Sequence, residues 1–204
     1  MLELDHVFYM VTEPEAAAQR LEEDGWVLDA GRAHRGQGTR NRRLAWRGQF
    51  FELLWVTDVA EARANPLRLD RRADWAGTAA SPVGLAFRGQ LDPSRGDDFW
   101  PYDALGPRIW IHRDNERHPE RPLVFVLETS GAEMEQRRLR APAALAHRRS
   151  GDLREVRVRG PSAPSLAPFA GPPVVHVQGP HGLELVAGDG AAALAVTTGL
   201  TIRS

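Results

Sequence analysis

The first quarter of the chain alternates between short apolar runs and turn-forming residues in a pattern that predicts one β-α-β-β-β unit. Residues 2–11 mix apolar and polar positions and are rich in Val, Phe and Tyr, which favours a strand. Thr12 followed by Glu15 has the spacing of a capping box, so we expect a helix over residues 13–24 that ends at Gly25. Three further strands are expected, over residues 26–30, 42–47 and 50–56.

The middle of the chain is less regular. Residues 58–80 are polar and arginine-rich, which indicates a connecting segment with some helix. A long loop is expected over residues 89–106, and a helix over residues 132–147 is interrupted by Pro142. Strands are expected over residues 83–88, 108–113 and 123–127.

Two segments of the first unit recur weakly near the end of the chain. Residues 4–8 and a following Pro/Ala-containing segment resemble residues 153–157 and the segment after them, and residues 46–54 resemble residues 176–185. The repetition predicts two related β-rich units, although matches of this length also arise by chance.

Composition excludes several classes of function. A net charge of −1 over 204 residues gives no electrostatic bias toward nucleic acid or an anionic membrane. Cysteine is absent, so thiolate nucleophiles and cysteine metal sites are excluded. All 26 basic residues are arginine, which removes Schiff-base and lysine general-base chemistry and suggests a GC-rich, bacterial genome. Any metal ion must therefore be held by His, Asp or Glu.

The sequence pattern also shows neither a signal peptide nor a membrane-spanning segment. The first residues include Glu3, Asp5 and His6, unlike a signal peptide, and no run approaches eighteen uncharged apolar residues. We therefore expect a cytoplasmic protein that binds neither nucleic acid nor a membrane.

Four features together resemble the glyoxalase-like domain group of the vicinal oxygen chelate (glyoxalase/bleomycin resistance/dioxygenase) superfamily. They are Leu4-Asp5-His6-Val7, Glu15-Ala16-Ala17-Ala18, the stretch from His34 to Asn41, and Phe51-Glu52-Leu53-Leu54. The match is good over residues 2–57 and looser beyond. The resemblance implies an α+β fold in which paired β-α-β-β-β modules form a curved, partly open mixed sheet around a concave pocket. It also implies that the pocket holds a divalent metal or a small-molecule ligand as partner, and that the protein is often a homodimer. Under it the chain divides into a first module (1–58), a connecting segment (59–80), a second, divergent module (81–190, with an insertion over 89–150) and a C-terminal strand or tail (191–204).

The same resemblance implies a metal site. Metal-using members take a histidine from the first strand and a glutamate from the fourth, which match His6 and Glu52, and Glu184 matches the glutamate of the second module. The fourth ligand falls on Gly84 under one alignment and on Glu155 under another. Imidazole and carboxylate ligands suit Zn, Ni, Mn, Fe or Mg, so the ligands alone do not choose the divalent metal.

The roles of Glu52, His6 and Glu184 each have more than one interpretation. A glutamate inside the apolar run at Glu52 is costly to bury unpaired, so it requires a metal ion, an arginine or a solvated cavity. His6 is either a ligand or a packed, hydrogen-bonded histidine, and the same choice applies to Glu184 with weaker force.

Substrate-binding residues are expected in two places. The glycines between His34 and Asn41 allow close backbone approach, and His34, Thr39 and Asn41 can hydrogen-bond a ligand. In the loop over residues 89–106, Trp100 and Tyr102 would form a wall or lid over the pocket, unless they serve ordinary packing.

Two functions follow. The first is a metal-dependent lyase or isomerase of the glyoxalase type, implied by the resemblance, in which the metal stabilises an enediolate and Glu52 or Glu184 moves the proton. The second is a non-catalytic binder of the antibiotic-sequestering kind, which needs a concave site with aromatic walls but no metal. A dioxygenase ranks lower, because its site needs two histidines and one carboxylate.

Overall fold

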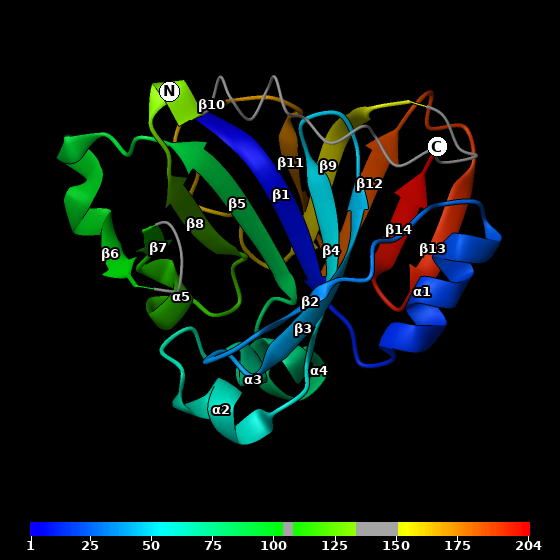
Figure 1. Ribbon diagram of the computed structural model, residues 1–204, viewed down its shortest axis with the longest axis horizontal. Helices are drawn as coiled ribbons and strands as arrows, with labels where there is room; N and C mark the ends of the chain where they lie inside the picture. The colour runs from blue at the N-terminus through cyan, green and yellow to red at the C-terminus, as the bar shows by residue number, and fades with distance from the viewer. Residues whose placement is uncertain (104–107, 134–150) are drawn as a thin grey trace.

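The computed structural model describes residues 1–103, 108–133 and 151–204, and it contains two β-sheets with short helices at their margins (Figure 1). The predicted α+β class with an open mixed sheet is confirmed. In the described residues the larger sheet has nine strands, and its main path runs in the order β2-β3-β4-β1-β5-β8-β7-β6. Its strands are β1 (Leu2–Met10), β2 (Arg32–His34), β3 (Thr39–Ala45), β4 (Phe50–Val56), β5 (Val83–Gly89), β6 (Phe99–Tyr102), β7 (Ile109–His112), β8 (Leu123–Glu128) and β10 (Phe169–Ala170), which pairs with β1.

The larger sheet contains two similar halves. In one half β1 pairs in parallel with β4, which is followed by β3 and β2; in the other β5 pairs in parallel with β8, which is followed by β7 and β6. The halves meet where β1 and β5 run antiparallel. This arrangement places β1, β4, β5 and β8 side by side at the centre of the sheet.

The smaller sheet is built from residues 153–203 and has the order β11-β9-β12-β14-β13. The smaller sheet covers one face of the larger sheet, and we call this face of the larger sheet the back face. Its strands are β9 (Leu153–Gly160), β11 (Val174–Gln178), β12 (Gly182–Ala187), β13 (Ala193–Thr197) and β14 (Leu200–Arg203).

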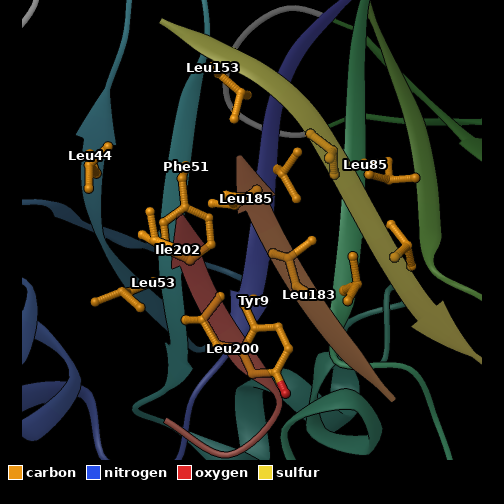
Figure 2. Packing of buried hydrophobic residues seen from close by; sticks show 14 of the residues in the cluster. Tyr9, Leu44, Phe51, Leu53, Leu85, Leu153, Leu183, Leu185, Leu200 and Ile202 are labelled. Carbon is orange, nitrogen blue, oxygen red and sulfur yellow. The ribbon is translucent and has the colours of Figure 1, made fainter. Parts of the chain in front are cut away.

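Figure 2 shows the core between the two sheets. Side chains from the back face, among them Phe51 and Leu53, meet Leu183, Leu185 and Ile202 of the smaller sheet, and all of these are buried. Tyr9 also points into this core and donates a hydrogen bond to the carbonyl of Thr198 at 2.9 Å. Because side chains alternate along a strand, the residues between these core positions face away from the smaller sheet.

Helices lie at the margins. The first helix, α1 (Pro14–Glu23), contacts β13, and β14 lies on the other side of β13. The segment after β4 folds into short helices beneath the ends of β1 and β4 (Figure 1). No helix in the described part of the chain is long and apolar enough to cross a membrane. The short helices are α2 (Val59–Ala64), α3 (Leu69–Ala73), α4 (Trp75–Thr78), α5 (Asp114–Arg117) and the 3₁₀ helix η1 (Pro93–Asp98).

Most predicted elements of the first 128 residues are confirmed, but two are wrong. Residues 26–30 form no strand, although Leu28 makes an isolated β-bridge with Leu44, and the strand of that region is β2, which begins six residues later. Residues 99–102, expected in a loop, form the edge strand β6. The expected helix over residues 132–147 lies almost entirely outside the described residues.

Candidate ligand-binding site

A cavity of about 580 Å³ lies on the face of the larger sheet that is turned away from the smaller one. This volume is within the range of small-molecule sites. Side chains from β1 to β4 supply all the charged residues of the lining, and further apolar side chains come from β7, β8 and the residues around the start of α3. The apolar residues of the lining outside β1 to β4 are Leu67, Leu69, Ile109, Ile111, Leu123, Phe125 and Leu127.

A β-bulge in β1 turns two neighbouring polar residues into this cavity. Leu4 pairs with Phe87 and His6 pairs with Ala86, so Asp5 has no partner residue on β5. The extra residue shifts the alternation of the strand by one position. Leu4 and Val7 therefore both face the core, while Asp5 and His6 both line the cavity.

Asp5 and His6 form a buried pair, and Arg88 on β5 also binds Asp5. The Nδ1 of His6 donates to the Oδ2 of Asp5 at 2.7 Å, and the Nη1 of Arg88 donates to the Oδ1 of Asp5 at 2.8 Å. Burial raises the pKa of the Asp5 carboxyl, but the hydrogen bond from His6 and the charge of Arg88 outweigh it, so the pKa lies below its ordinary value. The ring of His6 stacks on Phe50 with centroids 4.4 Å apart. His6 is therefore a packed and hydrogen-bonded histidine at the cavity wall.

Glu52 lies on β4 with its side chain in the cavity and is 6 % exposed. Its Oε1 accepts a hydrogen bond from the Nδ2 of Asn41 on β3 at 2.7 Å. Asn41 is fully buried, and its own oxygen accepts from the backbone N–H of Arg32 at 3.0 Å. Among the described residues the Oε2 of Glu52 has no hydrogen-bond partner, which leaves this oxygen for a ligand or for water in the cavity.

His34 lines the cavity from the β2–β3 hairpin. Its Nδ1 lies 3.1 Å from the Oγ1 of Thr39, which is buried behind it. Burial lowers the pKa of the His34 imidazole, and Arg32 adds to this effect, whereas the charge of Glu52 acts in the opposite direction. A neutral imidazole at this position can donate one hydrogen bond and accept another.

Tyr102 lines the cavity from β6 and is fixed by Asn65. The Nδ2 of Asn65 donates to the hydroxyl of Tyr102 at 2.8 Å and to the carbonyl of Gly36 in the β2–β3 turn at 2.6 Å. Asn65 thus connects the two halves of the larger sheet across one end of the cavity. Trp100 is not one of the lining residues, and its ring packs edge-on against Tyr102 with centroids 6.0 Å apart.

Glu184 lies elsewhere. It alternates in β12 with Leu183 and Leu185, which face the core, so its side chain points to the outer face of the smaller sheet. There its Oε1 accepts from the Nη1 of Arg157 at 2.7 Å and from the Nε of Arg203 at 2.9 Å. Two sheets separate Glu184 from the cavity that His6 and Glu52 share.

The two candidate positions for a fourth ligand do not supply one at the cavity. Gly84 has no side chain, and a Cβ there would lie 2.0 Å from the Cε1 of Phe8, whose ring covers it. Glu155 lies on β9 in the smaller sheet and pairs with Arg157.

The side chains at the cavity therefore do not fit the expected metal centre. The structure brings His6 and Glu52 to one cavity but not Glu184, and no group of three or more His, Cys, Asp or Glu side chains suited to a metal ion occurs in the described residues. His6 and Glu52 also have protein partners already, in Asp5 and Asn41.

Several lining residues were not predicted from the sequence. Asp5 was missed because strict alternation would turn it away from His6, and no residue type marks the bulge. Phe50 belonged to an apolar run, and the arginines of the hairpin region resembled other solvated clusters. The signal for the arginines is their position on both sides of His34. Those unpredicted residues include Asp5, Arg32, Arg35, Arg43 and Phe50.

Comparison with one solved structure agrees with this fold. A hypothetical protein from Staphylococcus aureus superposes over all of this chain and 98 % of its own, with a TM-score of 0.60 and 10 % identity. Methylmalonyl-CoA epimerase from Mycobacterium tuberculosis matches over 62 % of this chain and 87 % of its own, with a TM-score of 0.43 and 20 % identity. Among curated proteins, none is similar enough in sequence to match. The family model of the glyoxalase-like domain matches residues 4–170, which is most of the chain. The chain therefore belongs to the glyoxalase-like domain family.

Proposed function

We propose that this protein binds a small molecule in the cavity of the larger sheet without a metal ion. The observation that carries the proposal is the cavity of about 580 Å³, which is lined both by Glu52 and other charged residues of β1 to β4 and by an apolar wall from β7 and β8. A site of this size, with apolar walls and a few convergent polar groups, is typical of a ligand pocket. The donor set of a metal centre is not assembled there, which supports the binding function over the metal-dependent lyase.

A fluorescence titration tests this proposal. N-phenyl-1-naphthylamine is an apolar fluorophore small enough for the cavity, and we expect saturable binding to the wild-type protein. Ile109 and Leu127 are half-buried and line the apolar wall, so Ile109→Trp and Leu127→Trp should each fill the cavity and weaken binding about tenfold or more. Val175→Trp, on an exposed position of the smaller sheet, is the control and should leave binding unchanged. Equal binding by all variants would contradict the proposal.

A second candidate is metal-independent proton transfer by Glu52. It is favoured by the arrangement of this carboxylate, since Asn41 holds Oε1 while Oε2 has no partner among the described residues. A carboxylate held in this way can remove a proton from a carbon next to a carbonyl, and a neutral His34 can donate a hydrogen bond to the oxygen that becomes negative.

Deuterium exchange separates the catalyst from the binder. In D₂O the wild-type protein should accelerate the loss of the α-proton signals of dihydroxyacetone, followed by proton NMR, and Glu52→Gln should abolish the acceleration while N-phenyl-1-naphthylamine still binds. Absence of any acceleration by the wild-type protein, together with intact binding of the fluorophore, would leave the non-catalytic binder as the function.

A further inference from the structure

The charges around the cavity are not all balanced by protein partners. Asp5 is held by His6 and Arg88, and Arg43 donates through its Nε to the Oδ2 of Asp29 at 2.6 Å. Glu52 has the neutral amide of Asn41. Asp5 and Arg43 therefore have partners of opposite charge within the protein, whereas Glu52 has an amide on one of its two oxygens.

Arg32 and Arg35 are different. Both line the cavity from the β2–β3 hairpin, both side chains are exposed, and neither guanidinium has a hydrogen bond or ion pair within the described residues. Glu61 contacts the tip of this hairpin, but its Oε1 already accepts a hydrogen bond from the backbone N–H of Gly36. Counting only the part of the chain that the structure describes, two cations without partners therefore line the cavity.

The hairpin that carries these arginines is anchored. The carbonyl of Gly38 accepts from the backbone N–H groups of Thr57 and Asp58, at 2.8 and 3.1 Å. A Cβ on Gly38 would lie 2.2 Å from the carbonyl oxygen of Asp58, so only glycine permits this close packing. Together with the bond from Asn65 to Gly36, these contacts fix the backbone from which Arg32 and Arg35 project.

Resting on the proposed binding function, we propose that the ligand is an amphiphilic anion. Its carboxylate, sulfonate or phosphate group binds Arg32 and Arg35, and its apolar body lies against the side chains of β7 and β8. Guanidinium groups bind such oxyanions through paired, charge-assisted hydrogen bonds. The carboxylate of Glu52, which has only the neutral amide of Asn41 as a partner among the described residues, repels an anion from the region next to β4, so the orientation of the ligand follows from the distribution of charge.

Two fluorophores that differ in one group test this inference. 8-Anilinonaphthalene-1-sulfonate has the body of N-phenyl-1-naphthylamine with an added sulfonate. We expect the sulfonate to bind the wild-type protein more tightly than the neutral compound, and its affinity to fall as salt is raised, since exposed charges are screened. The double variant Arg32→Gln/Arg35→Gln should lose about tenfold in affinity for the sulfonate and keep its affinity for the neutral fluorophore.

Arg40→Gln is the matched control. Arg40 lies on the same hairpin, is exposed and is not a lining residue, so this variant removes one arginine charge without touching the cavity. Equal affinity of the wild-type protein and the double variant for the sulfonate, or an equal loss in Arg40→Gln, would overturn the inference. If neither fluorophore binds the wild-type protein, it is the proposed binding function that fails.

Discussion

Glu52 and Asn41 are the residues that define the polar side of the cavity. The Asn41 amide makes two hydrogen bonds: its Nδ2 donates to Glu52, and its oxygen accepts from the backbone N–H of Arg32 in the neighbouring strand. The apolar run around Glu52 was enough to predict a metal ion, an arginine or a solvated cavity. The structure combines a cavity with an amide, and no sequence pattern distinguishes an amide on the neighbouring strand from an arginine.

Removing the Asn41 amide should destabilise the protein. In Asn41→Ala, Glu52 and the N–H of Arg32 lose a buried partner, which costs about 1–3 kcal/mol of unfolding free energy. Urea denaturation of Asn41→Ala, Glu52→Leu and the double variant measures the coupling between the two side chains. We expect Asn41→Ala to cost less in the Glu52→Leu background, and a cost that is the same in both backgrounds would contradict the assigned hydrogen bond.

The lowered pKa of Asp5 predicts a loss of stability in acid. A carboxyl whose pKa is lower in the folded state stabilises the protein above the unfolded value of 3.8, and this contribution disappears as the pH falls through the folded value. We therefore expect the unfolding free energy of the wild-type protein to fall more steeply below about pH 4 than that of Asp5→Asn. Parallel pH profiles for the two proteins would show that Asp5 does not titrate in this way.

Strands were predictable from the sequence where one face is apolar, and this explains both the successes and the errors. The segments that became β4 and β8 have strong apolar runs. Residues 26–30 gave a false strand because Trp26 and Leu28 are buried in the core without belonging to a ladder, and burial produces the same apolar pattern. β2 was missed because it is charged and exposed, and β6 contains Pro101, which is tolerated since β6 is an edge strand.

The contact between β1 and β5 predicts a specific effect at Gly84. In Gly84→Ala the new Cβ would lie 2.0 Å from the ring of Phe8, and overpacking of this kind costs about 1–3 kcal/mol. The loss should be smaller in a Phe8→Leu background, because the shorter side chain leaves room. Gly96→Ala, where a Cβ meets nothing within 4 Å, is the control for thermal or urea unfolding. A Gly84→Ala variant as stable as Gly96→Ala would refute the assigned packing.

At the scale of the whole molecule, the smaller sheet decides which residues reach the cavity. Its core contacts use Leu183 and Leu185, and this turns Glu184 outward to Arg157 and Arg203. The similarity of residues 46–54 to residues 176–185 could not reveal this, because it gives strand patterns but not the sheet to which a strand belongs. The strand order shows a half built from β5 to β8 that corresponds to β1 to β4.

Tyr9 connects the two sheets and should make stability sensitive to alkaline pH. Burial raises the pKa of its phenol to about 12, opposed by the charge of Arg159. The folded protein therefore keeps this proton after the unfolded chain releases it near the ordinary value of 10, and stability falls as the pH rises from 10 toward 12. Tyr9→Phe should lose about 0.5–1.5 kcal/mol at neutral pH, through the bond to Thr198, and show a flatter alkaline limb in urea denaturation. An equally steep alkaline limb in Tyr9→Phe would exclude this role.

The location of ligand binding is the central claim, and an NMR titration in EDTA tests it most directly. Amide ¹H–¹⁵N spectra of the protein would be recorded with increasing N-phenyl-1-naphthylamine while EDTA removes divalent ions. We predict saturable shifts that concentrate in β4, β7 and β8 around Glu52, Ile111 and Phe125. Shifts confined to the smaller sheet, or binding that appears only after a divalent metal is restored, would contradict the account.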